Sequence, residues 1–324
     1  MSGQRVILAG GSGFLGQILA RHLVGRDYEV VVLSRSPVGA DSLVRQVQWD
    51  GRTHGDWARE LEGARAVVNL AGRSVNCRYT ARNRREILGS RLEPTRALGE
   101  AIGRCAAPPR VWLNSSTATI YKHSTGQAMD EARGEIGATP EAKDAFSVQV
   151  AVAWEEALER ARTPATRKLA LRTAMVLGPG RGGVFRVLRR LTRFGLGGAM
   201  PGGSQYVSWI HEADFCRAVE WLIERDDFQG PVNLAAPGPV PNREMMRTFR
   251  GVCRTPFGLP AARWMLEVGA FFLRTESELV LKSRRVIPGR LMQSGFEFRF
   301  SKLEEALRDI LGRTTNEQGN PDAR

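Results

Sequence analysis

The first third of the chain alternates between short apolar runs and segments with a single apolar face. Residues 6–9 and 30–33 are continuous apolar runs, and the apolar positions within residues 14–23 recur at helical spacing. A buried run, a helical segment and a second buried run are the parts of a β-α-β unit. The pattern therefore predicts two parallel strands joined by a helix at the start of the chain.

The same alternation continues over the next 140 residues or so. Helical sequence is expected over about 80–105 and 146–161, and further strands are expected at 47–49, 66–70, 111–113 and 169–171. Strands that alternate with helices at this spacing predict a parallel sheet covered by helices. We therefore expect an α/β fold with a Rossmann-type doubly wound parallel sheet.

The later segments predict a second, smaller domain. We place the Rossmann domain at residues 1–178, a smaller mixed α/β domain at 179–311 and a disordered polar tail at 312–324. The substrate cleft is expected between the two domains, where ligand sites are common. The amphipathic segment at 261–285 is expected to pack on the small domain or, less readily, on a partner subunit, so an oligomer is possible.

A glycine-rich turn lies between the first apolar run and the first helix. Gly10, Gly13 and Gly16 have the spacing G-x-x-G-x-x-G. Glycine lets the backbone turn tightly and lets a pyrophosphate approach the N-terminus of the helix, where N–H groups favour an anion. Because it lies between a buried strand and an amphipathic helix, the turn predicts a dinucleotide site that includes Phe14 and Leu15.

The end of the second strand favours NADP(H) over NAD(H). An acidic residue at this position would hydrogen-bond the ribose hydroxyls of NAD, whereas this chain has Ser34, Arg35 and Ser36. An arginine and two hydroxyls can receive a 2′-phosphate with charge-assisted hydrogen bonds. The alternative is that Arg35 is a solvated surface charge, since the chain is rich in arginine.

Further cofactor contacts are expected where other strands end, because ligands of doubly wound sheets lie at the carboxyl ends of the strands. Asp50 follows the third strand and is expected to flank the adenine. The remaining candidates lie at the ends of the fourth, fifth and sixth strands, and they are Asn69, Leu70, Ala71, Gly72, Ser115 to Thr117 and Val176.

Composition adds a strong basic excess. The chain has 324 residues and a formal net charge of +13, and 42 of its 47 cations are arginine. Such a balance raises nucleic acid as a partner, but the arginines are dispersed rather than clustered in a stripe, so we expect none. The four cysteines are far apart and include no C-x-x-C pair, which suits a reducing compartment and predicts no metal site. Strand-like sequence begins by Arg5 and no segment is apolar enough to span a bilayer, so a cytoplasmic protein without membrane contact is expected.

Taken together, these residues resemble the extended short-chain dehydrogenase/reductase superfamily. Within it, the chain is similar to the atypical subgroup named nucleoside-diphosphate-sugar epimerases, which has a characteristic C-terminal domain. The resemblance covers residues 5 to 311 and is carried by the glycine turn and by the segments 69–76, 78–80, 90–91, 115–121, 194–198, 208–211 and 295–298.

The resemblance does not supply the usual catalytic pair. In the superfamily a tyrosine, with a lysine four positions later on one helix, carries the proton. The residues four positions after the tyrosines of this chain are Val32, Asn83, Thr125 and Ile210, so no Tyr-x-x-x-Lys exists. By the superfamily pattern Thr117 would hydrogen-bond the substrate oxygen, or it is simply a strand-end hydroxyl. Tyr121 is a weaker candidate for the base.

Polar residues elsewhere are candidates for an anionic substrate. Arg73, Asn76 and Arg78 lie in the loop after the fourth strand, and guanidinium groups suit phosphate. Glu86 and Arg91 on the next helix could reach the cofactor or each other, or belong to a charged solvated face. Two further substrate candidates, of which the histidine is more often structural, are Ser208 and His211.

Two functions are compatible with these residues. One is an NADP(H)-dependent epimerase or reductase acting on a small molecule, possibly a nucleotide sugar. The other is an NADP(H)-binding sensor or scaffold protein with little or no catalysis, which the absence of the Tyr-x-x-x-Lys pair favours.

Overall fold

The computed structural model describes residues 4–37, 44–200, 202–260 and 282–319. It contains two compact units that are interleaved along the chain. Unit 1 comprises residues 1–117, 149–172 and 216–232, and unit 2 comprises residues 118–148, 173–215 and 233–324. The division therefore differs from the single boundary near residue 178 that the sequence predicts.

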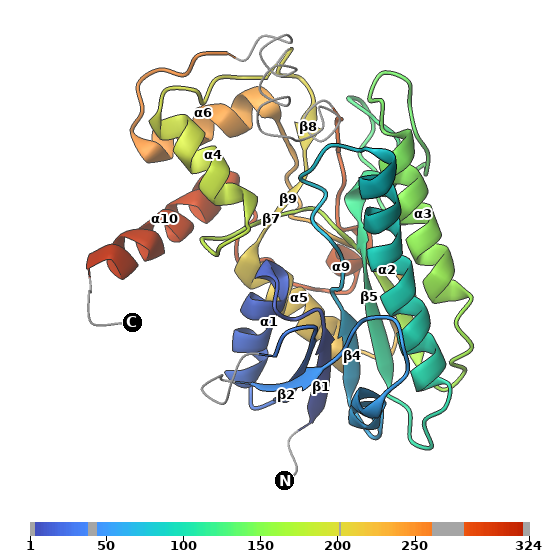
Figure 1. Ribbon diagram of the computed structural model, residues 1–324. Helices are drawn as coiled ribbons and strands as arrows, with labels where there is room; N and C mark the ends of the chain where they lie inside the picture. The colour runs from blue at the N-terminus through green and yellow to red at the C-terminus, as the bar shows by residue number, and fades with distance from the viewer. Residues whose placement is uncertain (1–3, 38–43, 201, 261–281, 320–324) are drawn as a thin grey trace. The chain divides into compact units, whose positions relative to one another are not determined.

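The sheet that dominates unit 1 confirms the predicted doubly wound fold. It has seven strands in the order β10-β6-β5-β4-β1-β2-β3, and the pairs β4–β5, β1–β4, β1–β2 and β2–β3 are all parallel (Figure 1). Their bounds are β1 Arg5–Ala9, β2 Glu29–Ser34, β3 Arg45–Gln48, β4 Ala66–Asn69, β5 Val111–Thr117, β6 Arg167–Thr173 and β10 Gly230–Leu234.

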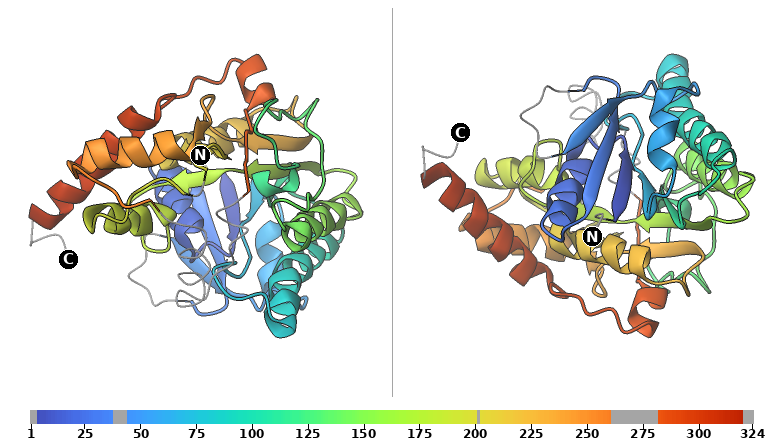
Figure 2. Two further views of the ribbon diagram at one scale, coloured as in Figure 1. Left: turned by 90° about the horizontal axis from the view of Figure 1, so that it is seen from above. Right: turned by 90° about the horizontal axis from the view of Figure 1, so that it is seen from below.

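Helices cover both faces of this sheet. The views in Figure 2 show α1 (Phe14–Val24) on one side and α2 (Ala81–Ile102) with α3 (Ala145–Glu159) on the other. Thr80 caps α2, since its side chain accepts the N–H of Asn83. Pro94 lies inside α2, where it removes one backbone donor and bends the helix.

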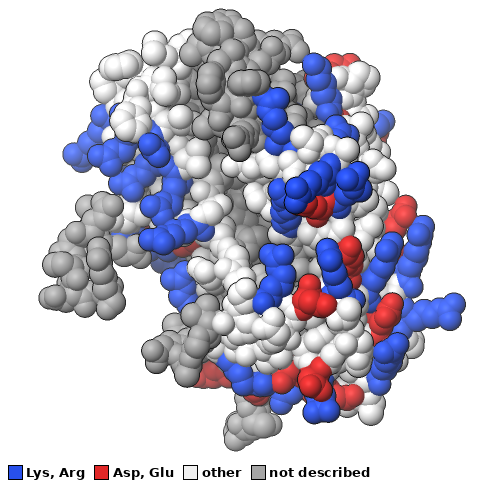
Figure 3. All heavy atoms as spheres, viewed as in Figure 1, with Lys and Arg blue, Asp and Glu red and all other residues white. Residues whose placement is uncertain are grey.

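The outward sides of α2 and α3 carry much of the charge of unit 1. Glu86 pairs with Arg82 at 2.8 Å and Glu156 pairs with Arg160 at 3.0 Å, both one helical turn apart. Figure 3 shows Lys and Arg side chains spread over the visible face, with Asp and Glu among them. Exposed pairs of this kind contribute about 0.3–0.5 kcal/mol each.

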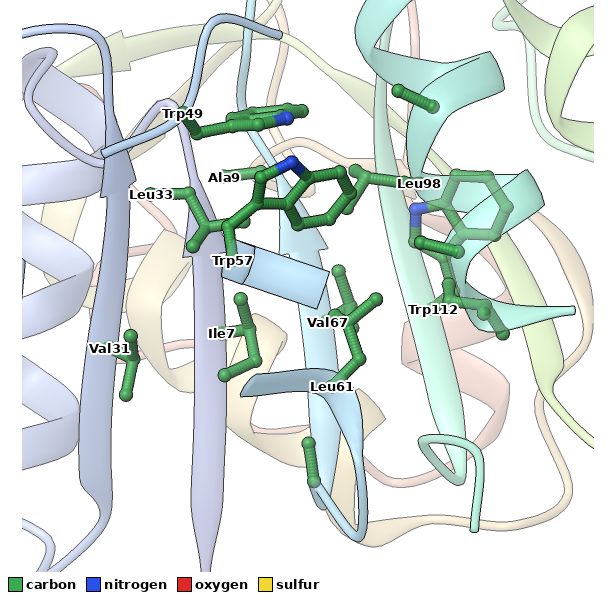
Figure 4. Packing of buried hydrophobic residues seen from close by; sticks show 14 of the residues in the cluster. Ile7, Ala9, Val31, Leu33, Trp49, Trp57, Leu61, Val67, Leu98 and Trp112 are labelled. Carbon is green, nitrogen blue, oxygen red and sulfur yellow. The ribbon is translucent and has the colours of Figure 1, made fainter. Parts of the chain in front are cut away.

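A buried apolar cluster fills the space between the sheet and α2 (Figure 4). Alternate residues of the strands point into it, because successive side chains of a strand face opposite ways. Trp49 and Trp57, the latter on the 3-10 turn η1 (Asp56–Leu61), pack with their ring centroids 5.3 Å apart. Other members are Ile7, Val31, Val67, Leu98 and Trp112.

Unit 2 is a mixed α/β arrangement of about the same length as unit 1, whereas the sequence predicts a smaller second domain. Strand β7 (Met175–Leu177) pairs in parallel with β9 (Trp209–His211), and β8 (Tyr206–Val207) pairs antiparallel with β11 (Val240–Pro241). Its helical elements are η2 (Ala118–Ile120), α4 (Val184–Arg193), α6 (Asn242–Cys253), α9 (Gly289–Gln293) and α10 (Leu303–Gly319), while α5 (Glu212–Glu224) begins in unit 2 and continues into unit 1. Phe185 and Phe249 meet in its core, which α4, α6 and α10 build.

The C-terminal region differs from the predicted tail. Helix α10 runs to Gly319, so residues 312–319 are helical where the sequence predicts disorder. The helix continues because Leu307, Ile310 and Thr314 repeat at helical spacing and are buried. An Arg313–Asp309 ion pair at 2.9 Å also spans its last turns. Most of the amphipathic segment 261–285 lies outside the described residues.

The described part of the chain contains neither a membrane-spanning helix nor a cluster of metal-binding side chains. No helix there is long and apolar enough to cross a membrane. No group of three or more His, Cys, Asp or Glu side chains there could hold a metal ion.

Candidate functional site

The strand order of unit 1 creates a place for a ligand at the carboxyl edge of its sheet. The chain leaves β1 for β2 on one side, while β4 pairs with β1 on the other side. Where the strand order reverses in this way, the loops after neighbouring strands diverge and leave a crevice. The segments that follow β1, β2, β4 and β5 hold most of the predicted cofactor residues.

Two of the three predicted glycines are required by the protein itself. Gly10 has a φ of +74°, and a Cβ there would lie 2.7 Å from the Cα of Ala71 in the turn after β4. A Cβ on Gly16 would lie 2.3 Å from the Cα of Gly11. The turn after β1 and the turn after β4 therefore touch, and neither glycine can be replaced without moving backbone.

Gly13 is different, because the protein leaves room for a side chain there. A Cβ on Gly13 would come no closer than 3.9 Å to another atom, the carbonyl oxygen of Gly10. Gly13 is also the N-cap of α1, so no side chain caps the first backbone N–H groups of this helix. The first turn of α1 carries no acidic residue either. A backbone open at a helix N-terminus is the arrangement that receives a pyrophosphate.

The residues after β2 are arranged as a short turn with one exposed cation. Ser34 is buried, and its hydroxyl accepts the backbone N–H of Ser36 at 3.3 Å. The Arg35 carbonyl accepts from Gln48 at 2.8 Å, so the backbone is fixed while the guanidinium is exposed. Arg35 and Ser36 are thus accessible to a ligand, whereas Ser34 shapes the turn.

Asp50 has a local structural role in the turn after β3, and its place beside the adenine stays a prediction. Its carboxylate accepts the backbone N–H groups of Arg52 and Thr53, and also the Thr53 hydroxyl at 2.7 Å. These hydrogen bonds to the charged form lower the pKa of Asp50. The carboxylate closes the turn that follows β3, which explains why an acidic residue stands there.

The turn after β4 lies against a partly buried arginine. The Leu70 N–H donates to the Ala9 carbonyl at 2.8 Å, which fixes the start of the turn. A Cβ on Gly72 would meet the guanidinium carbon of Arg91 at 3.4 Å, so Gly72 leaves space for that side chain. Arg91 comes from α2 and packs its guanidinium 5.1 Å from the ring centroid of Trp154 on α3.

Arg91 is the cation of this site that lacks a carboxylate partner within the described residues. Its Nη1 donates to the Ile87 carbonyl at 2.9 Å, and burial lowers its pKa to about 10. Arg91 is partly buried, and a partly desolvated cation without an opposite charge interacts more strongly with an anion beside it than a fully exposed arginine does. Arg91 is therefore suited to a phosphate of the cofactor.

Glu86 does not reach Arg91, in contrast to one of the sequence expectations. It forms ion pairs with Arg73 and Arg82, the first from the loop after β4 and the second from the preceding turn of α2. Arg73 is thereby partly neutralised and is less available for a substrate phosphate than its sequence position predicts. Asn76 and Arg78 in the same loop are exposed.

Thr117 is the last residue of β5 and is half-buried. The strand end is anchored by its neighbour Ser116, whose hydroxyl donates to Glu155 on α3 at 2.6 Å. Glu155 also receives two hydrogen bonds from Arg172, at 2.9 and 2.8 Å, and the Arg172 side chain is only 6% exposed. This bidentate pair fixes the strand edge beside Thr117.

Tyr121 occupies a buried position in unit 2 that does not suit a base. It is 1% exposed, its hydroxyl donates to Asn233 at 2.9 Å, and its ring lies where a side chain on Gly134 would otherwise be. A tyrosine held in this way satisfies an internal polar partner. The structure therefore gives Tyr121 a structural role.

The remaining predicted residues of unit 2 are also buried and engaged. The Ser208 hydroxyl donates to the Arg284 carbonyl and accepts the N–H of Val286, both at 2.7 Å. Val176 on β7 pairs with Ile210 of β9. His211 accepts the Ala213 N–H and lies 3.2 Å from Asp309. Ser208 and His211 thus hold the fold of unit 2 together instead of facing a substrate.

A set of polar residues lies beneath the turn after β4, of which the sequence predicts only Asn69, and as a residue facing the cofactor. Their side chains are buried and hydrogen-bonded to one another in unit 1, and they are Asn69, Thr95, Asn114 and Trp154. A signal for two of them was present, because an asparagine inside an otherwise apolar strand requires a partner. Thr95 gave a weaker signal, since its hydroxyl can bond the carbonyl four residues back in a helix.

Two family models match the chain. The model of the NAD dependent epimerase/dehydratase family matches residues 6–235, and that of a domain of unknown function, DUF1731, matches residues 261–310. Epimerase family protein SDR39U1 of Bos taurus is 31% identical over 313 residues, spanning 95% of this chain and 99% of the relative. Epimerase family protein Mb2239 of Mycobacterium bovis is 32% identical over 311 residues, 95% of this chain and 97% of the relative.

Solved structures show the same similarity. Human SDR39U1 (isoform 2), crystallised with NADPH, superposes with a TM-score of 0.82 at 29% identity and covers 95% of this chain and 99% of its own. MoeE5 in complex with UDP-glucose and NAD has a TM-score of 0.72 at 20% identity, over 97% of this chain and 99% of its own, which is a likeness of fold alone.

Proposed function

The chain belongs to the NAD-dependent epimerase/dehydratase family, and from that premise we propose that it binds NADP(H) at the carboxyl edge of the sheet in unit 1. The observation that carries the proposal is the pair of Gly13 and Arg91, an open helix N-terminus and a partly buried guanidinium without a carboxylate partner in the described residues. The NADPH in human SDR39U1 supports it, because that structure covers nearly the whole chain.

Within this proposal each segment of the site has a defined task. The turn Gly10 to Gly16 and Arg91 receive the pyrophosphate. Arg35 and Ser36, which are exposed after β2, receive the 2′-phosphate that distinguishes NADP(H) from NAD(H). Leu70 to Gly72 form the neighbouring wall, which follows from the contact between Gly10 and Ala71.

We propose further that the protein is a cytoplasmic epimerase or reductase of a small anionic molecule such as a nucleotide sugar. Bound NADP(H) would supply hydride transfer at one substrate carbon, which is a carbinol in the reduced state and a carbonyl in the oxidised state. Thr117, half-buried at the end of β5, orients the oxygen of that carbon, and Asn76 and Arg78 contact the anionic part. The proposal assigns no residue as the base, since the chain contains no Tyr-x-x-x-Lys and Tyr121 is buried.

That same absence favours a second candidate function, an NADP(H)-binding sensor or scaffold protein with little or no turnover. Its binding site would be identical, and only the chemistry at Thr117 would differ. Incubation with stoichiometric NADPH and a panel of sugar nucleotides, ketones and aldehydes separates the two. Consumption of NADPH or an epimerised product supports the enzyme, and neither of them supports the sensor for that panel.

The cofactor proposal is tested by titration with NADPH and NADH. Wild type should prefer NADPH, and Arg35→Ala should lose about 10- to 100-fold in NADPH affinity, the scale of hydrogen bonds to a charged group, with little change for NADH. Arg104→Ala, at another exposed arginine of unit 1, is the matched control. Equal wild-type affinities for the two dinucleotides would refute the assignment of the 2′-phosphate to Arg35.

A further inference from the structure

Beneath the turn after β4, four elements of unit 1 meet in one buried polar network. Asn69 of β4, Thr95 of α2 and Asn114 of β5 are at most 1% exposed, and Trp154 of α3 is 6% exposed. Asn69 Nδ2 donates to Asn114 Oδ1 at 2.7 Å and to Thr95 Oγ1 at 3.2 Å. Trp154 Nε1 donates to Thr95 Oγ1 at 3.1 Å. Thr95 therefore lies at the point where the two helices and the sheet are joined.

The Thr95 hydroxyl uses all of its hydrogen-bonding capacity. A hydroxyl offers one proton and two acceptor positions. Asn69 and Trp154 fill the acceptor positions, and the proton goes to the Arg91 carbonyl at 2.8 Å rather than to Asn114 Oδ1 at 3.3 Å. The hydroxyl is thus held in one orientation, with its proton on the backbone of Arg91.

The segment of α2 around Arg91 needs such a tie. Pro94 lacks an N–H, so the regular ladder of α2 is interrupted one turn before it, beside Arg91. Thr95 attaches the Arg91 backbone to the sheet through Asn69, while Trp154, held by the same hydroxyl, lies under the Arg91 guanidinium at 5.1 Å. Both ends of Arg91, its carbonyl and its charged head, are thereby fixed relative to Thr95.

We propose that Thr95 is a positioning residue of the dinucleotide site, which holds the Arg91 guanidinium where the pyrophosphate binds. This inference rests on the proposed NADP(H) site. Thr95 itself touches neither cofactor nor substrate, because it is completely buried. Its effect on binding passes through Arg91, whose head lies against the Gly72 turn.

Two substitutions separate this role from a contribution to stability alone. Thr95→Val keeps the shape of the side chain and removes the hydroxyl, whereas Thr95→Ser keeps the hydroxyl and removes a methyl group. Thr95→Val should weaken NADPH binding by about tenfold, which is the scale of one lost hydrogen bond between the Arg91 guanidinium and a phosphate. Thr95→Ser should stay within about threefold of wild type. Thermal unfolding of both variants is followed in parallel, since a purely structural residue would lower stability without this split in affinity.

A double-substitution cycle with Arg91→Met tests the route of the effect. If Thr95 acts through Arg91, adding Thr95→Val to Arg91→Met should change NADPH affinity by less than about threefold. A full tenfold loss in that background overturns the proposal, and so does wild-type affinity in Thr95→Val.

Titration with inorganic pyrophosphate distinguishes failure of this inference from failure of the proposed function. If wild type binds pyrophosphate but not NADPH, and pyrophosphate affinity falls in Thr95→Val but not in Thr95→Ser, the positioning role stands and the cofactor assignment falls. If wild type binds NADPH and Thr95→Val binds both probes as wild type does, the cofactor assignment stands and the positioning role falls. Binding of neither probe by wild type overturns both.

Discussion

Acid should destabilise unit 2 through one buried histidine. His211 is 1% exposed, and its Nδ1 accepts the Ala213 N–H at 3.0 Å at the start of α5. Its Nε2 lies 3.2 Å from both Asp309 Oδ2 and Arg313 Nη2. Protonation would place a hydrogen on the nitrogen that accepts the Ala213 bond and would add a buried positive charge beside Arg313.

Burial first, and then the charge of Arg313, lower the pKa of His211 from 6.5 to about 4, against the opposing influence of Asp309 and Asp214. Between these two values the unfolded chain binds a proton that the folded chain does not, so the free energy of unfolding falls as the pH falls from about 6.5 to 4. At about 1.4 kcal/mol per pH unit, the contribution lost over the whole window is on the order of 3 kcal/mol.

Urea unfolding of wild type and His211→Asn between pH 7.5 and 4.5 measures this term. Asparagine offers a side-chain carbonyl to the Ala213 N–H and does not titrate, so the variant retains the cap and removes the proton. Wild type should lose about 2–3 kcal/mol more than His211→Asn over this range, while carboxylates contribute equally to both. Parallel stability profiles, or an NMR titration of His211 near pH 6.5, would refute the reasoning.

Two further predictions concern unit 1. Gly13→Ala should unfold at the wild-type temperature, because its Cβ has 3.9 Å of clearance, but should weaken NADPH binding. Gly16→Ala should instead unfold at a much lower temperature, because its Cβ would lie 2.3 Å from the Gly11 Cα. Thermal unfolding and NADPH titration of the two glycine variants check these expectations. Equal unfolding temperatures of the two variants would contradict them. Glu155→Gln should lower the free energy of unfolding by about 3 kcal/mol, since it leaves the buried Arg172 without its carboxylate. Urea unfolding measures this against Glu156→Gln on the exposed side of α3, and similar losses in the two variants would count against a buried pair.

Most of unit 1 could be predicted from the sequence, because each strand and helix has its own pattern of apolar residues. The runs 6–9 and 30–33 are buried strands, and the helical face of 14–23 is α1, with bounds that differ from the structure by one residue. Apolar periodicity reports burial directly, so it locates elements well. The glycine turn can also be predicted, since its spacing lies between an apolar run and a helical face, although the contact that requires Gly10 is with the distant Ala71.

The polar residues were harder to predict, because their roles depend on partners far along the chain. Glu86 was assigned to the cofactor, yet its partner Arg73 comes from a preceding loop. Tyr121 looked like a candidate base, but its hydroxyl meets Asn233, which is 112 residues away. A sequence gives the type of such a side chain and not its neighbour.

The interleaving of the two units has a consequence for synthesis of the chain. The chain passes between the units five times, at 117/118, 148/149, 172/173, 215/216 and 232/233. Unit 1 therefore cannot be completed on the ribosome until Val232 has emerged, more than a hundred residues after its first five strands. A fragment that ends near residue 178 would lack β10 and all of α5, leaving β6 as an open sheet edge. Separating the two units requires linkers that rejoin the three segments of each unit, because no single stop codon divides them.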